Sequence, residues 1–328
     1  MLGGGPAHGG AVCAVFAPNG RRVDEWDCFK IGVNEMASVT AIIPVKNRVN
    51  LLERAIDSVL GQSARVNEII VVDDGSNPTI ESTINKKYLN DIYILRLEKS
   101  INAAAARNLG VDKSGSDFIA FLDSDDEWRA NHIEGMLADA EKYKSSCEFF
   151  VSPIRDIKNL KNNHFIKDPY DWLFSKKLDF RTTGFFIKKG LFIRFGGFDP
   201  LQEKHQDWDF ALRLGRENAM YYRGESTILI DSSAEQRMSS CANINASHRF
   251  LEKHEMFMEK EHIAGFIKMI ASHACLNKNS KIYNESKELA RKYNVNFGRS
   301  LSGKVLWFIP VIYPILLNIK LNLNHRVK

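Results

Sequence analysis

Apolar runs alternate with stretches of helical periodicity from residue 38 onward. Residues between the runs place apolar side chains at three- and four-residue spacing, which predicts helices over 50–60 and 102–113. The runs themselves are short and rich in β-branched and aromatic residues, as strands are: 39–44, 68–72, 92–97 and 118–122. Because these strands read as apolar throughout, the pattern predicts an α/β fold, with a mostly parallel, Rossmann-like sheet flanked by helices on both faces.

Local signals set the expected boundaries of these elements. Pro44 should end the first strand, and Asn50 followed by Glu53 should cap the first helix through a capping box. A further amphipathic helix is expected over 131–145, and a highly charged helical region over 247–293.

Two acidic clusters follow two of the predicted strands. One is Asp73-Asp74-Gly75-Ser76 after 68–72, and the other is Asp123-Ser124-Asp125-Asp126 after 118–122. Open α/β sheets bind ligands outside the carboxyl ends of their strands, so we expect both clusters there, in exposed turns. Asp123 and Asp125 can share a hard divalent cation such as Mg²⁺ or Mn²⁺. The alternative is a solvated turn that caps the next helix.

Three other residues are candidates, each beside a structural alternative. Asp74 can accept hydrogen bonds from a nucleotide, or simply belong to an Asp-Gly β-turn. Arg107, on the alanine-rich helix, can bind a phosphate or be an exposed helical arginine. Asp207 precedes a helix expected from Trp208 onward, and it can accept a proton from an attacking hydroxyl or cap that helix. If Asp207 proves not to be the base, Asp209 is the first residue to test in its place.

Motifs that the sequence lacks disfavour several enzyme classes. After residue 36 there is no G-x-G-x-x-G, no G-x-x-x-x-G-K-[ST] and no G-x-S-x-G, the signatures of dinucleotide-dependent dehydrogenases, P-loop enzymes and α/β-hydrolases. The net charge of +5 is too small and too mixed to indicate a nucleic-acid partner. Five scattered cysteines with no C-x-x-C spacing fit reduced thiols in a cytosol.

Taken together, these motifs resemble the family 2 glycosyltransferases, inverting enzymes with the GT-A fold, of the bacterial surface-polysaccharide type. The resemblance covers roughly residues 38–240. Six segments carry it in the right order: 39–48, 70–76, 106–110, 121–126, 196–199 and 206–209.

The resemblance implies a nucleotide-diphosphate sugar donor, a UDP-sugar above others, and inversion at the anomeric carbon. By that analogy the base pocket contains Pro44 and Asp74, and Asp123 meets the ribose. Arg107 neighbours the nucleotide, and Asp125 holds Mn²⁺ or Mg²⁺ on the diphosphate. Asp207 deprotonates the acceptor hydroxyl.

The sequence departs from the family pattern at two positions. Gln206 stands where the family usually has an acidic residue, so the orientation of the acceptor can differ here. Met238 stands near the place where many members carry a histidine that reaches the metal or the diphosphate. A thioether replaces that histidine poorly, which leaves the third protein ligand open.

Three regions are predicted along the chain. Residues 1–36 form a disordered leader or a non-native extension, 37–245 form the GT-A nucleotide-sugar-binding and catalytic domain, and 246–328 form a helical C-terminal extension with an apolar and basic tail. The apolar run 305–319 is shorter than the ~20 residues that span a bilayer. Residues 304–328 are basic and contain no acid, which suits either peripheral contact with an anionic membrane or packing on the preceding helices.

Membrane contact through this tail indicates a cytoplasmic protein, peripheral on the inner face of the cytoplasmic membrane. Its natural acceptor is then a glycan on a polyprenyl carrier. Two other functions stay open. A sugar-nucleotidyltransferase should have a glycine-rich loop after the first strand, but residues 44–48 contain no glycine. A non-catalytic nucleotide-sugar-binding protein would have no need of Asp207.

Overall fold

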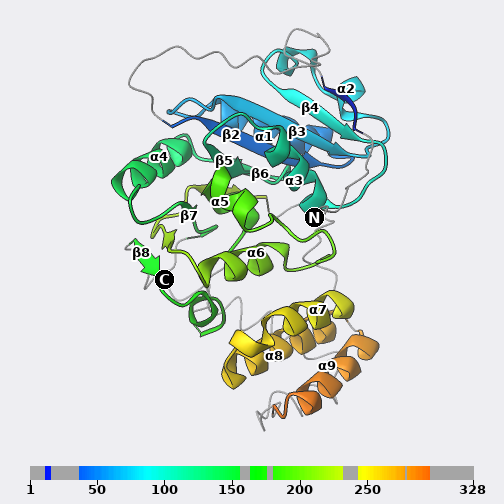
Figure 1. Cartoon of the computed structure of the whole chain (residues 1–328). Coiled ribbons are helices and arrows are strands. Elements are labelled where there is room, and N and C mark those ends of the chain that lie inside the picture. The colour runs from blue at the N-terminus through cyan, green and yellow to red at the C-terminus, as the bar shows by residue number, and fades with distance from the viewer. Residues whose placement is uncertain are drawn as a thin grey trace, which may run out of the picture. The chain divides into compact units, whose positions relative to one another are not determined.

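The computed structural model describes residues 12–15, 37–155, 163–175, 180–231, 243–277 and 279–295 (Figure 1). The chain divides into two compact units. The first consists of Met1–Pro169, Leu178–Leu201 and Gln206–Ala234, and the second of Tyr170–Lys177, Gln202–His205 and Glu235–Lys328.

A mixed sheet of nine strands organises the first unit, in the order β1-β4-β3-β2-β5-β9-β7-β10-β8. Its centre, β4-β3-β2-β5, is parallel, whereas β1, β9 and β8 pair antiparallel with their neighbours. The strands are β1 (Val12–Val15), β2 (Val39–Val45), β3 (Glu68–Asp74), β4 (Tyr93–Leu97), β5 (Phe118–Phe121), β7 (Phe149–Val151), β8 (His164–Ile166), β9 (Phe185–Lys188) and β10 (Met220–Tyr222). A separate antiparallel pair consists of β6 (Asp126–Trp128) and β11 (Ile228–Ile230).

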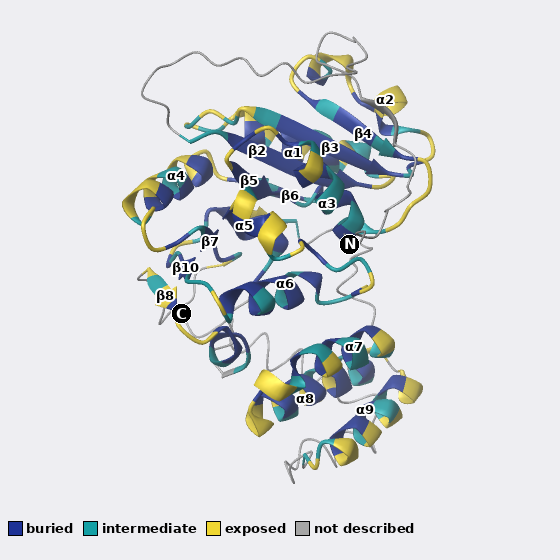
Figure 2. Cartoon of the chain, in the orientation of Figure 1, coloured by how far each residue is buried: buried dark blue, intermediate teal, exposed yellow. Residues whose placement is uncertain are grey.

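Helices cover both faces of this sheet, whose central strands β2 and β5 are buried along their whole length (Figure 2). One face packs Ala41 and Ile43 against α1 (Val49–Leu60) and α4 (His132–Lys142). On the other face, Ile42 touches α3 (Ala103–Lys113), where a Cβ added to Gly110 would lie 2.7 Å from the Ile42 side chain. That face also carries an aromatic cluster of Phe121, Phe192 of α5 (Lys189–Arg194), Phe198, and Phe210 of α6 (Gln206–Gly215). A short helix, α2 (Ile80–Thr83), follows β3.

The second unit is helical. Its main elements are α7 (Ile244–His254), α8 (Lys260–Leu276) and α9 (Ser280–Lys292). Phe250 of α7 and Phe266 of α8 stack with ring centroids 4.9 Å apart, which joins these two helices. Among the residues that the structure describes, no helix is both long and apolar enough to cross a bilayer. The predicted tail 304–328 lies outside those residues.

The predicted fold class is confirmed, with each expected element within a few residues of its place.

Three local expectations differ. β2 continues through Pro44 to Val45, because β5 has ended beside Ile42 and Pro44 pairs only with Val72 of β3. α1 begins at Val49 with Arg48 as its N-cap, so Asn50 lies inside the helix. The carboxylate of Glu53 instead accepts the backbone N–H of Asn85 at 2.8 Å. Within 1–36, the described residues Val12–Val15 form β1 on the edge of the sheet.

Candidate active site

The parallel centre of the sheet brings four loops to one edge. In the ladders, Val45 of β2 lies beside Asp73 of β3, and Asp73 beside Arg96 of β4, so these strands end at the same level. β5 runs parallel to β2 and ends beside Ile42. Both acidic clusters therefore meet at the carboxyl edge, as predicted from the order of strands and turns.

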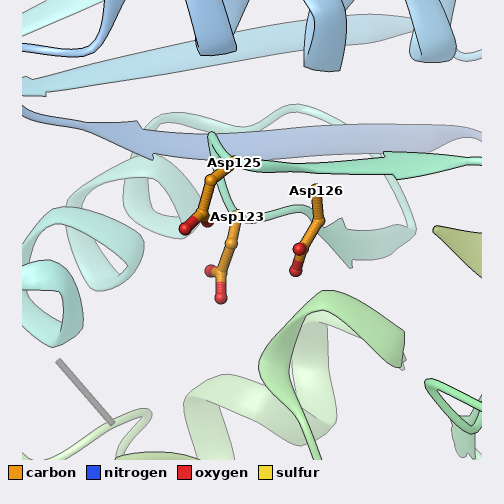
Figure 3. A group of neighbouring side chains, drawn as sticks. All are labelled: Asp123, Asp125 and Asp126. Atoms are coloured by element: carbon orange, nitrogen blue, oxygen red, sulfur yellow. The ribbon is translucent and has the colours of Figure 1, made fainter. Parts of the chain in front are cut away.

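The second acidic cluster is compact. Asp123, Asp125 and Asp126 each offer a carboxylate oxygen, and these atoms all lie within 4.8 Å of one another. Figure 3 shows the three carboxylates on the same side of the turn. The element after this turn is the strand β6, which begins at Asp126, so the alternative of a cap for the next helix is wrong. Three convergent carboxylates suit a hard cation such as Mg²⁺ or Mn²⁺.

Two arginines from different elements hold this cluster. Nη2 of Arg107 donates to Oδ1 of Asp123 at 2.5 Å, and Nη1 of Arg48 donates to Oδ2 of Asp125 at 3.3 Å. Arg107 is buried, which excludes the alternative of an exposed helical arginine. Its Nε is also buried and has no hydrogen-bond partner among the residues that the structure describes. A buried donor without a partner is costly, which makes this atom a candidate contact for a ligand.

The first acidic cluster differs from our expectation of an exposed turn, because Asp73 and Asp74 are both buried. Asp73 accepts the backbone N–H groups of Ser76 at 2.8 Å and Ile80 at 3.1 Å, and it pairs with Arg96 at 2.5 Å. These bonds shape the turn from the inside. Asp73 is therefore a residue that positions the loop, a role that its sequence context did not reveal.

Asp74 contacts the loop after β4. Its carboxylate accepts the hydroxyl of Ser100 at 2.7 Å and the backbone N–H of Ile101 at 2.8 Å. Each carboxylate oxygen has a further lone pair that a ligand N–H can use. Gly75 follows with φ +71°, and a Cβ there would lie 2.7 Å from the Ser100 nitrogen. The turn at Asp74-Gly75 is thus packed tightly against the loop after β4. Asp74 can belong to this β-turn and still bind a ligand.

Asp207 lies in the first turn of α6, which begins at Gln206, two residues earlier than expected. The loop before α6 is fixed to α3: Asn108 exchanges two hydrogen bonds with the backbone of Phe198, at 2.7 and 3.0 Å. The Phe198 ring packs on Phe210 of α6, and the Arg107 guanidinium lies 5.6 Å from the Phe198 centroid. The Phe198 ring therefore packs between α6, which carries Asp207, and Arg107, which binds Asp123.

Asp209 has a different environment from Asp207. Its side chain is fully buried and accepts Nε of Arg213 at 3.0 Å. Arg213 also donates to the carbonyls of Phe195 and Gly197, both at 2.6 Å. This environment disfavours Asp209 as an alternative base, because its carboxylate is enclosed and paired with Arg213, which in turn binds the carbonyls of Phe195 and Gly197.

Gln206, the residue at the first departure from the family pattern, is buried. Within the described part of the chain, its Nε2 has no hydrogen-bond partner. Met238, at the second departure, lies outside the described residues.

A buried histidine, His132, packs against β6. The His132 ring stacks on Trp128 of β6 at 4.6 Å between centroids, and its Nδ1 lies 2.6 Å from the Thr227 hydroxyl. Complete burial, and secondarily the positive charge of Arg223, lowers the pKa of His132 to about 3. His132 is therefore neutral near pH 7. It was assigned no role from the sequence, since a lone histidine carries no local signal.

Arg48 and Asp126 were also missed. The signal for Asp126 was present, because it directly follows Asp125 and begins an alternating strand. For Arg48 no local signal exists, since its partner Asp125 lies 77 residues away.

Comparison with known proteins identifies similar sequences and folds. The sequence model of glycosyl transferase family 2 matches residues 40–204. An uncharacterized glycosyltransferase of Rickettsia bellii is 44% identical over 100 residues, which are 30% of this chain and only 14% of that relative. The amylovoran biosynthesis glycosyltransferase AmsB of Erwinia amylovora is 25% identical over 196 residues, covering 55% of this chain and 64% of AmsB.

Among solved structures, S. aureus TarS 1–349 in complex with UDP-GlcNAc aligns with a TM-score of 0.54. The alignment covers 80% of this chain and 93% of TarS 1–349, at 14% sequence identity. At that identity the likeness concerns the fold, and it agrees with the predicted GT-A architecture.

Proposed function

The chain belongs to glycosyl transferase family 2, and from this we propose that it transfers a sugar, with inversion, from a nucleotide-diphosphate donor to a glycan hydroxyl. The observation that supports this most strongly is the convergence of Asp123, Asp125 and Asp126 at the carboxyl edge of the sheet, with Arg107 beside them. Acidic ligands and a buried guanidinium at one edge suit a ligand that carries both phosphates and a cation.

A divalent cation, Mn²⁺ or Mg²⁺, fits the donor set of this cluster. Its ligands would be carboxylate oxygens, with Asp125 first and Asp123 and Asp126 beside it. When bound, the cation offsets the negative charge that develops on the leaving diphosphate.

The donor would lie along the edge formed by the loops after β2, β3 and β5. In this proposal Asp74 and the end of β2 at Pro44 receive the base, and Asp123 receives the ribose. Arg107 would contact the phosphates through its buried Nε, which has no partner among the described residues. UDP is the preferred nucleotide, supported by the UDP-GlcNAc complex of TarS, whose fold is similar.

Asp207 is the proposed base. The acceptor hydroxyl gives its proton to the Asp207 carboxylate while its oxygen forms a bond to the anomeric carbon. The bond from that carbon to the diphosphate oxygen breaks, and its electron pair leaves with the nucleoside diphosphate. Attack opposite to the leaving group inverts the anomeric centre, and the half-buried Asp207 is accessible for this role.

The acceptor is proposed to be a lipid-linked glycan in the synthesis of a cell-surface polysaccharide. AmsB, which acts in amylovoran biosynthesis by its name, supports the polysaccharide part. The basic, acid-free sequence of 304–328 supports peripheral contact with the cytoplasmic face of a membrane.

A panel of nucleotide sugars, each with an acceptor extract and with or without Mn²⁺, tests the proposal. The measured quantity is free nucleoside diphosphate, and we expect its Mn²⁺-dependent release from one UDP-sugar. Release of pyrophosphate from a sugar phosphate and UTP would indicate a nucleotidyltransferase instead. Tight donor binding with no turnover on any acceptor would indicate a non-catalytic binding protein.

A further inference from the structure

The two arginines that hold the acidic cluster differ in how exposed their side chains are. Arg107 has a side chain only 6% exposed, packed beside Phe198, and its contact with Asp123 measures 2.5 Å. Arg48 is 33% exposed and lies 3.3 Å from Asp125. Ion pairs between partly exposed side chains are weak because solvent screens them. Of the two contacts, the one between Arg48 and Asp125 is therefore the easier to break.

The backbone beneath Arg48 is nevertheless fixed. Its neighbour Asn47 has φ 55° and is bound to the turn after β3: the Asn47 N–H donates to the Ser76 hydroxyl at 2.9 Å, and the Asn47 side-chain oxygen accepts the N–H of Asn77 at 2.8 Å. Arg48 is also the N-cap of α1. A change of partner by the Arg48 side chain would therefore leave this backbone in place.

A cation on Asp125 would disturb this pair. The guanidinium and a divalent cation compete for the same carboxylate, and the two positive charges repel each other at such short range. Arg48 must then turn to another anion or to solvent. Since its guanidinium already lies at the cluster, the phosphates of a nucleotide bound there are within reach. A guanidinium fork suits phosphate oxygens well.

We propose that Arg48 is an exchangeable counter-ion of the donor site: it holds Asp125 when the cation is absent, and it binds the donor diphosphate once the cation displaces it. This inference rests on the proposed function, because it takes Asp125 as the cation ligand. It adds a diphosphate-binding residue and couples binding of cation and nucleotide. Removing Arg48 should consequently move the two affinities in opposite directions.

Calorimetry on the full chain measures both affinities, first with MnCl₂ alone and then with UDP at saturating Mn²⁺. Arg48→Met removes the charge while keeping an unbranched side chain. Arg65→Met is the matched control. Arg65 is exposed and lies elsewhere in the first unit, and its replacement changes the net charge by the same amount. Arg48→Lys keeps the charge but loses the two parallel N–H donors of the guanidinium. Thermal melting checks that every variant is folded.

For Arg48→Met we expect Mn²⁺ alone to bind about three- to fivefold more tightly, since a weak internal competitor is gone. At saturating Mn²⁺, UDP should bind roughly tenfold more weakly, because one charge-assisted hydrogen bond to the diphosphate is lost. Arg48→Lys should keep Mn²⁺ affinity within about twofold of wild type and weaken UDP. Arg65→Met should behave like wild type.

Weaker binding of both Mn²⁺ and UDP in Arg48→Met would overturn the exchange, because it would make Arg48 a purely structural support of Asp125. Unchanged Mn²⁺ affinity or unchanged UDP affinity would also overturn it. In these cases the wild-type protein still binds both ligands, and the proposed function stands. If wild-type protein binds neither Mn²⁺ nor UDP, the donor site itself is wrong and the inference falls with it.

Discussion

Asp207 and Asp209 are two residues apart on α6, and their carboxylates occupy opposite environments. Asp207 is half-buried and accepts the adjacent backbone N–H of Trp208 at 2.9 Å. Asp209 is fully buried and paired with Arg213 at 3.0 Å. The helix thus carries one partly exposed carboxylate and one that is enclosed in an ion pair.

Asp207→Asn should therefore remove turnover without removing donor binding. The amide keeps the size of the side chain but cannot accept the proton, so we expect turnover to fall by roughly 10²–10⁴-fold. Donor affinity should change little, and both quantities are measured on one preparation. Turnover within a few-fold of wild type would show that Asp207 is not the base. A collapse of affinity would place Asp207 in the donor site.

Asp209→Asn should affect stability first. Neutralising this buried carboxylate leaves Arg213 without its counter-charge, at an expected cost of about 3 kcal/mol in the free energy of unfolding. Urea denaturation measures that cost. Unchanged stability would contradict the structural role of the Asp209–Arg213 pair.

Asp125→Ala should abolish Mn²⁺-dependent binding of UDP while leaving the fold intact. Asp125 lies in a turn, so truncation opens no cavity in the core, and its partner Arg48 can reach solvent. Calorimetry with UDP and Mn²⁺ is the measurement, and Asp112→Ala on the exposed side of α3 is the control. Undiminished binding in Asp125→Ala would refute the metal assignment.

His132 predicts a specific dependence of stability on pH. Its folded-state pKa of about 3 lies below the unfolded value near 6.5, so the unfolded state binds the extra proton between these values. The contribution of His132 is complete above pH 6.5 and is lost as the pH falls toward 3. His132→Gln should be less stable than wild type at pH 7.5, and the gap should narrow by about 2 kcal/mol at pH 4.5. Urea unfolding at both pH values tests this, and parallel losses in the two proteins would refute it.

The tail prediction depends on sequence alone. Because 304–328 is apolar and basic without an acidic residue, deleting it should release the protein from anionic vesicles but leave turnover on a soluble acceptor analogue. Flotation with anionic and with neutral vesicles is the measurement. If the full chain floats with neither, the membrane contact does not exist.

Local patterns in the sequence were sufficient for the architecture. The apolar runs at 39–44 and 118–122 became β2 and β5, because a strand buried on both faces must be apolar along its length. The order of strands and turns also placed Asp74, Asp123 and Asp125 at one edge, since parallel strands end on the same side. Capping signals were less reliable: Asn50 lies inside α1 because contacts between Asn47 and the turn after β3 determine where that helix begins.

Only the tertiary structure decided which charges meet. Arg48 and Asp125 are 77 residues apart, and Arg107 and Asp123 are 16 apart, so no periodicity or motif couples them. The burial of Asp73 and the enclosure of Asp209 likewise depend on distant partners, Arg96 and the carbonyls that Arg213 binds. Hydrophobic periodicity is a local property of the chain and can be read from the sequence. Charge pairing and burial are relations between segments, and they exist only once the sheet has brought its loops together.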